Sequence, residues 1–181
     1  MLTLAIFYGS TTCYTEMVAE KLLALLQADP RFGDYQLSLH NIKHTPIATM
    51  AQYDVLILGI STWDFGELQE DWESQWQDIQ QVQLDGKIVA IFGLGDQLGY
   101  TDWFVDAVGM LDQAISHNRL QRIGYWSTEG YDFAKSKATT DDGDWFVGLA
   151  LDEANQYDLT DSRLSDWCDQ ISEELQQLRA E

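Results

Sequence analysis

The chain has 181 residues and a formal net charge of -20, from 30 acidic and 10 basic side chains. This charge argues against nucleic acid or anionic lipid as a partner and favours basic surfaces, unless the acidity serves only solubility. Because 45% of the residues are apolar and 12% are aromatic, disorder is excluded, and the length fits a single domain over residues 1–181.

Short apolar runs alternate with helical patterns, which is typical of repeated β-α units and a buried parallel sheet. The predicted elements, in chain order, are a strand at Leu2 to Tyr8, a helix at Thr15 to Gln27, strands at Tyr35 to His40 and Val55 to Gly59, a helix at Glu70 to Ile79, a strand at Ile88 to Phe92, a helix at Thr101 to Ser116, a strand at Arg122 to Trp126 and a helix at Ser162 to Arg179. This alternation predicts a small doubly wound α/β domain.

The last predicted helix carries its apolar residues at helical spacing, so they share one face. They are Leu164, Trp167, Cys168, Ile171, Leu175 and Leu178. Thr160 or Asp161 is expected to cap the start of this helix by accepting a backbone N–H hydrogen bond.

The segment from Ser127 to Phe146 does not fit the alternation, and the residues after it, "VGLAL", again have the pattern of a strand. We therefore expect a last strand that is interrupted by a long insertion, which is either functional or a decoration. Its acidic tip, Asp141, Asp142 and Asp144, is equally compatible with a solvated loop and with a partner contact.

The two cysteines, Cys13 and Cys168, lie far apart and outside any CxxC or Cys/His array, which predicts neither a zinc site nor a disulfide framework. The N-terminal apolar run is short and has no basic region before it, unlike a signal peptide or a membrane span. We expect a soluble cytoplasmic protein with reduced thiols and no metal site.

Residues 8–16, "YGSTTCYTE", form a strand-to-helix turn, where free backbone N–H groups and the helix dipole favour an anion. Its hydroxyl donors are Ser10, Thr11, Thr12, Tyr14 and Thr15. Neither GxxxxGK[ST] nor GxGxxG is present, so a single phosphomonoester is a better ligand than a nucleoside triphosphate or a dinucleotide. The alternative for this stretch alone is an ordinary capped helix start.

Two further loops, residues 59–72 and 93–104, follow predicted strands and would meet the first loop at the carboxyl edge of the sheet. Each carries an aromatic residue, Trp63 and Tyr100, and two aromatics on facing loops can enclose a flat ring. The alternative for either residue is packing on its own loop.

The stretches "FYGSTTCYTE", "GISTWDFGELQEDW", "GLGDQLGYTDWF" and "GLALDEANQYDLTD" together resemble those of flavodoxins, specifically long-chain flavodoxins close to the B type. The resemblance covers essentially the whole chain. It implies a three-layer fold with a five-stranded parallel sheet of order 2-1-3-4-5, and non-covalently bound FMN.

The resemblance also implies residue roles. The FMN phosphate would be held by Ser10, Thr11, Thr12, Cys13, Tyr14 and Thr15, with Thr62 near the phosphate end. The isoalloxazine ring would stack between Trp63 and Tyr100, beside the turn formed by Asp64, Phe65 and Gly66. Leu94, Gly95, Asp96 and Gly99 would face the pyrimidine edge, and Asp152 would lie near the ribityl chain.

The sequence departs from the family pattern in two places. Cys13 replaces a glycine of the phosphate loop; if this position has a positive φ, the side chain costs about 1 kcal/mol and weakens FMN binding. Asp64 and Phe65 occupy a turn where many relatives have asparagine followed by a small or aliphatic residue, which affects the redox potentials.

The expected function is that of a low-potential one-electron carrier, not an enzyme, since the flavin supplies the chemistry. Acidic surroundings would disfavour the anionic hydroquinone. The resemblance further implies a peptide flip after the tryptophan that stabilises a neutral semiquinone; here it would fall in the 64–66 turn, where Gly66 would give backbone freedom. The expected partners of this monomer are an NAD(P)H-dependent reductase and acceptor enzymes with basic surfaces. Carboxylates such as Glu67, Glu70 and Asp71 are either a solvated helix face or a docking rim.

Two rival functions remain open at this point. An FMN-dependent quinone or nitro reductase would need a substrate pocket over the ring, which Trp63 and Tyr100 would cover. A flavin-free response regulator would need acidic residues after the first strand, and residues 9–13 contain none. The histidines, His40, His44 and His117, are scattered and form neither a metal nor a triad pattern.

Overall fold

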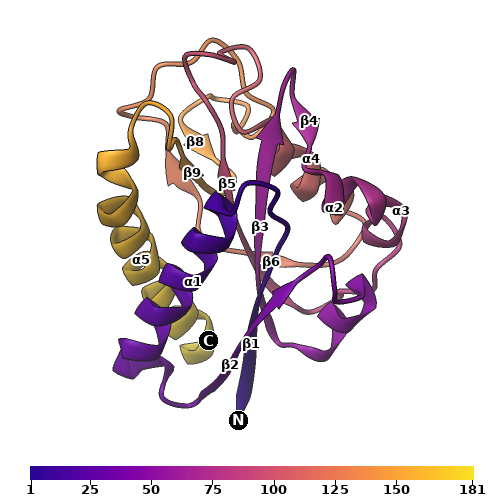
Figure 1. Ribbon diagram of the computed structural model, residues 1–181. Helices are drawn as coiled ribbons and strands as arrows, with labels where there is room; N and C mark the ends of the chain where they lie inside the picture. The colour runs from indigo at the N-terminus through magenta and orange to yellow at the C-terminus, as the bar shows by residue number, and fades with distance from the viewer.

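The central sheet has the strand order β2-β1-β3-β5-β6, with all five strands parallel, in the computed structural model, which describes residues 1–181 (Figure 1). These strands are β1 (Leu2–Tyr8), β2 (Tyr35–Asn41), β3 (Val55–Trp63), β5 (Ile88–Leu94) and β6 (Gln121–Arg122). Buried runs rich in β-branched and aromatic residues form the middle strands. The expected order 2-1-3-4-5 is therefore confirmed.

The fifth strand is split into two short pieces that pair with β5. Its first piece is β6, and its second piece is β9 (Leu149–Leu151), which pairs with Phe92–Leu94. The expected interruption is thus confirmed, but the predicted strand Arg122 to Trp126 is wrong after Arg122. Gly124, at φ 80°, turns the chain away from the sheet.

The insertion forms a small hairpin of its own, in which β7 (Trp126–Ser127) pairs antiparallel with β8 (Trp145–Phe146). A second short antiparallel piece, β4 (Glu67–Leu68), folds back on the end of β3. Both pieces lie close to the carboxyl edge of the parallel sheet.

Helices cover both faces of the sheet, which gives the expected three layers (Figure 1). On one face lie α1 (Tyr14–Ala28) and α5 (Thr160–Ala180), and on the other lie α2 (Glu70–Ser74), α3 (Trp76–Ile79) and α4 (Asp106–Ala114). The connections contain the 3-10 helices η1 (Pro30–Phe32), η2 (Ile47–Gln52) and η3 (Tyr157–Leu159). No helix is both long and apolar enough to span a bilayer.

Each helical layer encloses its own apolar core against the sheet. Trp167 and Leu22 are fully buried on the α1/α5 side, and Trp72 and Leu111 are fully buried on the other side. Burial of each such side chain contributes about 1.5–3 kcal/mol. The expected core position of Cys168 is confirmed, and burial raises the pKa of this thiol to about 11.

Three predicted helix features are wrong. The helix predicted from Glu70 to Ile79 is two short helices, because Gln75 leaves helical geometry at φ -111° and ψ 15°. The helix predicted from Thr101 begins only at Asp106, because Val105 has a left-handed φ of 47°. Residues 101–105 form turns instead.

The expected cap of α5 is the third error. Thr160 is already helical, at φ -59° and ψ -48°, because η3 runs directly into α5, so its side chain cannot reach back as an N-cap. Its hydroxyl oxygen is buried without a hydrogen-bond partner. Asp161 instead accepts a hydrogen bond from Lys21 Nζ at 2.7 Å.

Candidate cofactor site

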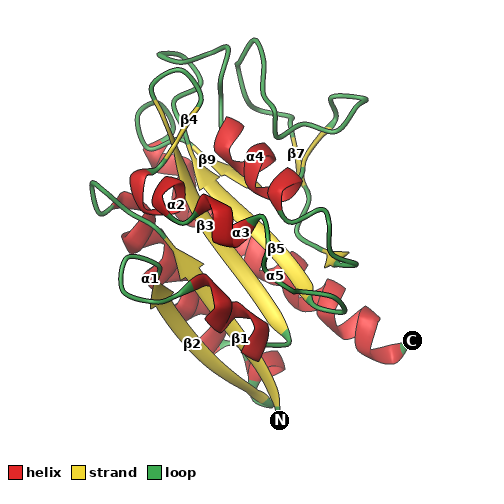
Figure 2. Cartoon of the chain, turned by 90° about the vertical axis from the view of Figure 1, so that its right-hand side faces the viewer, coloured by secondary structure: helices red, strands yellow, loops and turns green.

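The loops that follow the parallel strands gather at one end of the molecule (Figure 2). Between them lies a cavity of about 410 Å³. Its lining residues are Thr12, Tyr14, Thr15, Ser61, Thr62, Trp63, Asp64, Leu94, Gly95, Asp96, Tyr100, Glu153 and Ala154. The carboxyl edge of the sheet is where ligands bind in open α/β folds.

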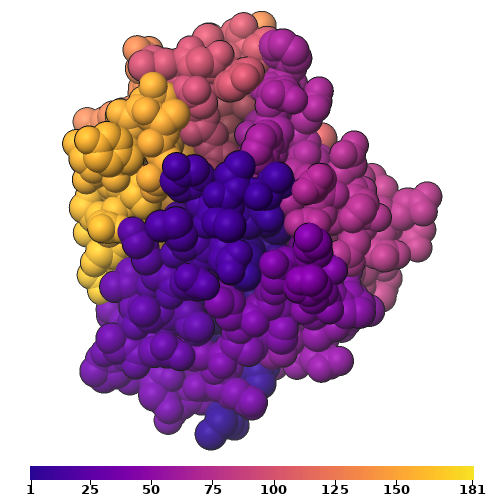
Figure 3. Space-filling model, in the orientation of Figure 1, coloured from indigo at the N-terminus to yellow at the C-terminus, as the bar shows by residue number.

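The first loop presents a row of unused backbone donors. The N–H groups of residues 10–15 have no acceptor in the protein, whereas the N–H of Glu16 is bonded to Ser10 Oγ at 3.4 Å. In Figure 3 the N-terminal part of the chain that contains this loop is exposed on the surface, next to the segment that begins α5. Unpaired N–H groups at the start of a 15-residue helix form an anion site.

Cys13 lies in this loop with φ 69° and ψ -4°, and its side chain is exposed. A positive φ is unusual for a residue with a Cβ and is commonly served by glycine. The condition stated for this position, a positive φ, is therefore met.

Gln69 joins the first loop to the second. Its Nε2 donates to Thr11 Oγ1 at 3.1 Å, and its Oε1 accepts from the N–H groups of Asp71 and Trp72 at the start of α2. This side chain is completely buried. A Cβ on Gly9 would collide with it, so the first loop passes close by only because residue 9 is glycine.

Trp63, at the end of β3, and Tyr100, in the loop after β5, contribute aromatic walls to the cavity. Trp63 is half-buried, and its Nε1 donates to Ser61 Oγ at 2.9 Å, which holds the indole ring. Tyr100 keeps 38% of its surface exposed. Exposed aromatic faces on opposite loops suit a flat ring ligand.

The turn after Trp63 has two left-handed residues, Asp64 at φ 42° and Gly66 at φ 83°. A Cβ on Gly66 would lie 2.8 Å from Asp106 Oδ2 and 2.9 Å from Trp103 Cδ1, so only glycine fits there. Phe65 is 67% exposed and meets the Trp103 ring edge-on, with 5.1 Å between centroids. The turn is therefore packed on one side and exposed on the other.

Asp96 lines the cavity and also shapes its own loop. Its Oδ1 accepts hydrogen bonds from the N–H groups of Leu98 and Gly99 and from Asn155 Nδ2. Burial would raise the pKa of Asp96, but the bonds from Gly99, Asn155 and Leu98 outweigh it and hold the pKa below its ordinary value.

Asp152 lies behind the cavity. It is completely buried, and its carboxylate accepts hydrogen bonds from the Gln97 backbone and side chain and from Asn155. It thus ties the loop after β5 to the loop after β9. The cavity is lined instead by its neighbours Glu153 and Ala154.

The predicted site residues therefore fall into two groups. Those that line the cavity are Thr12, Tyr14, Thr15, Thr62, Trp63, Asp64, Leu94, Gly95, Asp96 and Tyr100. Those outside its lining are Ser10, Thr11, Cys13, Phe65, Gly66, Gly99 and Asp152. Thr62 has a second contact, since its Oγ1 accepts the N–H of Ala107 at 3.0 Å.

Sequence reasoning missed Ser61, Glu153 and Ala154 in the lining and the linking side chain of Gln69. Ser61 lies near the carboxyl end of β3, within the stretch 59–72 that the sequence already indicated, so a signal for it was available. The role of Gln69 depends on a contact 58 residues away in sequence, which no local pattern encodes.

The charged side chains of the lining are all acidic: Asp64, Asp96 and Glu153. A bound phosphate would therefore depend on backbone N–H groups and hydroxyls rather than on lysine or arginine. Additional negative charge on a ligand would be disfavoured by these carboxylates.

The fold and the cavity have the features of a mononucleotide-binding α/β protein: unpaired N–H groups at the first helix for one phosphate, and aromatic walls on the next two loops for a flat ring. A model of the family described as flavodoxin matches residues 6–167. The chain belongs to the flavodoxin family. This membership rules out the response-regulator alternative.

Individual flavodoxins are similar to this chain over nearly its full length. The chain is 53% identical to Flavodoxin 2 of Escherichia coli, covering 96% of this chain and 97% of the relative. It is 44% identical to a flavodoxin of Nostoc sp., covering 95% and 96%. Among solved structures, a Fusobacterium nucleatum flavodoxin bound to flavin mononucleotide has a TM-score of 0.86 at 28% identity, covering 96% of this chain and 99% of that one.

Proposed function

We propose that this flavodoxin is a low-potential one-electron carrier that holds FMN non-covalently and shuttles between a reductase and acceptor enzymes. The coarse function, an FMN-binding electron-transfer protein rather than an enzyme, follows from the family. The observation that supports the cofactor assignment best is the pairing of unpaired N–H groups with aromatic walls in one cavity.

Different residues of this chain would hold the phosphate and the ring of FMN. The N–H groups of residues 10–15 and the hydroxyls of Thr12 and Thr15 would bind the phosphate, and Trp63 and Tyr100 would enclose the ring. FMN supplies reversible one-electron chemistry, while the protein orients it and sets its potentials.

The acidic lining supports a low potential for the second electron. An added electron that is matched by a proton would leave the charge at the site unchanged. An added electron without a proton would place a negative charge beside Asp64, Asp96 and Glu153. Like charge in a partly desolvated site disfavours that added charge.

The 64–66 turn supports a stable neutral semiquinone. The peptide after Trp63 would rearrange so that its carbonyl accepts a hydrogen bond from the protonated ring nitrogen. Gly66 at φ 83° marks a turn that only glycine completes, whereas Asp64 and Phe65 are exposed.

The acidic start of α2 supports docking of basic partners. Glu67 and Glu70 are exposed near the cavity, and the first turn of α2 also contains Asp71 and Glu73. An NAD(P)H-dependent reductase with a basic surface would be steered to this face. We also propose that the protein is a cytoplasmic monomer, since the exposed thiol of Cys13 suits a reducing compartment.

The cofactor assignment is tested with FMN and riboflavin, which differ only by the phosphate. Apo-protein should bind FMN at least about a hundredfold more tightly, because charged hydrogen bonds contribute about 1.5–3 kcal/mol each. Replacement of Trp63 by alanine should weaken both ligands by a similar factor. Equal affinity for FMN and riboflavin, or failure to bind either, would contradict the assignment.

A further inference from the structure

The insertion is bonded to the segment that follows Tyr100. The N–H groups of Ala134 and Lys135 donate to Thr101 O at 2.9 and 3.0 Å, and Ser136 Oγ donates to Phe104 O at 2.5 Å. A Cβ on Gly109 would collide with the carbonyl of Lys137. Residues 134–137 thus pack directly against residues 101–109.

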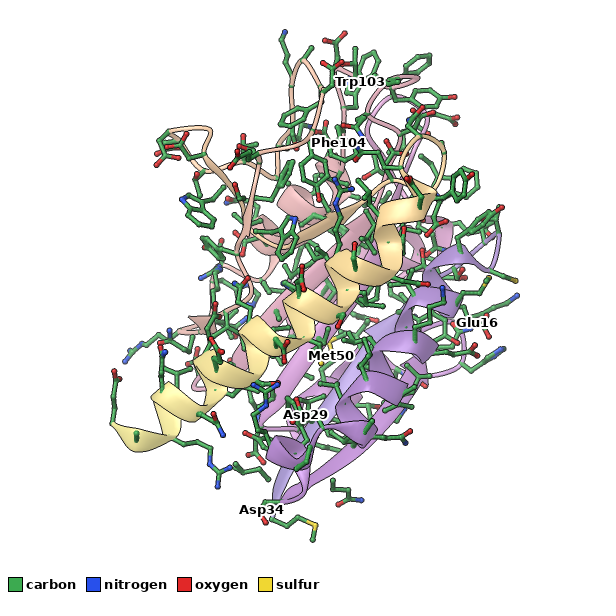
Figure 4. All side chains as sticks on the ribbon, turned by 90° about the vertical axis from the view of Figure 1, so that its left-hand side faces the viewer. Glu16, Asp29, Asp34, Met50, Trp103 and Phe104 are labelled. Carbon is green, nitrogen blue, oxygen red and sulfur yellow. The ribbon has the colours of Figure 1, made fainter.

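Figure 4 shows the position of this contact, with Trp103 at the rim where the loops gather and Phe104 further inside. Phe104 is completely buried and packs on Phe133 of the insertion, with 5.5 Å between ring centroids. Trp103 instead contacts the 64–66 turn through Phe65 and Gly66.

Asp106 touches both the insertion and the turn. It is 1% exposed, and its Oδ1 accepts the N–H of Lys137 at 2.7 Å. Its Oδ2 would lie 2.8 Å from a Cβ on Gly66, so this oxygen occupies the space beside the glycine. Asp106 is thus hydrogen-bonded to the insertion and packs beside the turn at Gly66.

The charges around this carboxylate are few. The groove of about 620 Å³ in front of it contains Lys135, Lys137 and Asp102. Burial raises the pKa of Asp106, and the N–H and the ammonium of Lys137 oppose that rise. The insertion therefore also supplies the charge that compensates the buried acid.

We infer that Asp106 is a positioning residue that holds the Gly66 end of the 64–66 turn against the insertion, so that the insertion sets the balance between the two one-electron steps of the flavin. With Gly66 held, rearrangement of the turn is confined to Asp64 and Phe65. This inference rests on the proposed function, because it assigns the insertion a role in tuning that same site.

The test compares the equilibrium between the one-electron state and the two outer redox states in FMN-loaded variants. Asp106→Ala should reduce the stability of the one-electron state at least tenfold, because the turn loses its anchor. Asp106→Asn keeps an acceptor for the Lys137 N–H and should have a smaller effect. Asp102→Asn, an exposed neighbour with the same loss of charge, should change the equilibrium less than twofold.

A purely structural role for Asp106 predicts a different pattern: a lower urea midpoint of Asp106→Ala with an unchanged redox equilibrium. That pattern would overturn the inference. If Asp106→Ala does not fold, the test uses Lys137→Pro, which removes the donated N–H but leaves Asp106 in place. This variant should lower the stability of the one-electron state several-fold. An unchanged stability of that state would also overturn the inference. If the unmodified protein has no one-electron state, the proposed function fails; if it has one that these variants leave unaltered, only this inference fails.

Discussion

Cys13 is the residue at which this chain accepts a backbone conformation that a glycine would adopt without cost. Its φ of 69° lies in the left-handed region, and none of the N–H groups around it is bonded to the protein. We predict that the loop relaxes in solution when no ligand is bound, so that phosphate binding must restore the left-handed conformation at a cost of about 1 kcal/mol.

We predict that Cys13→Gly binds FMN about fivefold more tightly, which corresponds to about 1 kcal/mol. The measurement is quenching of FMN fluorescence by apo-protein. Cys13→Ala is the matched control, because it removes the thiol but keeps the Cβ, and it should show no gain. Equal affinities of the glycine and alanine variants would exclude backbone strain as the cause.

Asp96 contributes to stability through its ionised form. Because its pKa in the folded protein lies below the ordinary value of 3.8, the folded state binds this proton less readily than the unfolded state. The contribution is therefore present above about pH 4 and is lost as the pH falls through the folded value.

Replacement by asparagine keeps an oxygen acceptor but removes the charge. We predict that Asp96→Asn lowers the free energy of unfolding of the apo-protein by about 1 kcal/mol at pH 7, with a smaller difference at pH 3. Urea unfolding at the two pH values measures this. Asp102→Asn, which removes a charge without loop hydrogen bonds, should leave both values nearly unchanged; a loss as large as that of Asp96→Asn would contradict this explanation.

At the scale of elements, α2 combines two tasks. Gln69 caps it and bonds the loop of residues 10–15 through Thr11, while its first turn carries the acidic residues Glu70, Asp71 and Glu73. If these carboxylates dock a partner, they should raise the rate of association with it at low salt, because surface charge steers encounter and is screened by salt.

We predict that the double charge reversal Glu67→Lys and Glu70→Lys slows reduction by a reductase with a basic surface at least several-fold at low ionic strength. The difference should shrink at about 0.5 M salt, where the screening length is only a few Å. The control is Glu173→Lys, the same type of change on the C-terminal half of α5, far from the cavity. Equal rates for the reversed and unmodified proteins at low salt would exclude the docking role.

An element could be predicted from the sequence where its own residues determine its structure. The buried runs of β1, β3 and β5 predict strands because their residues are apolar on both faces. The break at Gln75 and the late start of α4 were not predictable, because they depend on tertiary contacts. Gln75 Nε2 donates to Ile42 O, and Asp106 at the start of α4 is held by the insertion.

At the scale of the whole molecule, the cavity was foreseeable in position but not in detail. Topology alone brings the carboxyl ends of β1, β3 and β5 together, so three loops with hydroxyls and aromatics predict one shared site. The burial of Asp152 depends on its contacts with Gln97 and Asn155, and that of Asp106 on an insertion 31 residues away. Neither acid differs in local pattern from the exposed acids around it.

Negative charge characterises both the whole molecule and the cavity. Its net charge of -20 disfavours polyanionic partners, and carboxylates also surround the cavity at Asp64, Asp96 and Glu153. The overall field and the local field thus have the same sign: under the proposed function, both would favour basic partners and both would oppose a second electron on the flavin.

The most direct measurement is an anaerobic reductive titration of the FMN-loaded protein, followed by its visible spectrum. We predict that the oxidised flavin spectrum passes through the long-wavelength absorption of a neutral semiquinone before it bleaches, with the second electron entering at a clearly lower potential than the first. Direct conversion of oxidised to fully reduced flavin, with no one-electron species at any point, would contradict one-electron shuttling as the function of this protein.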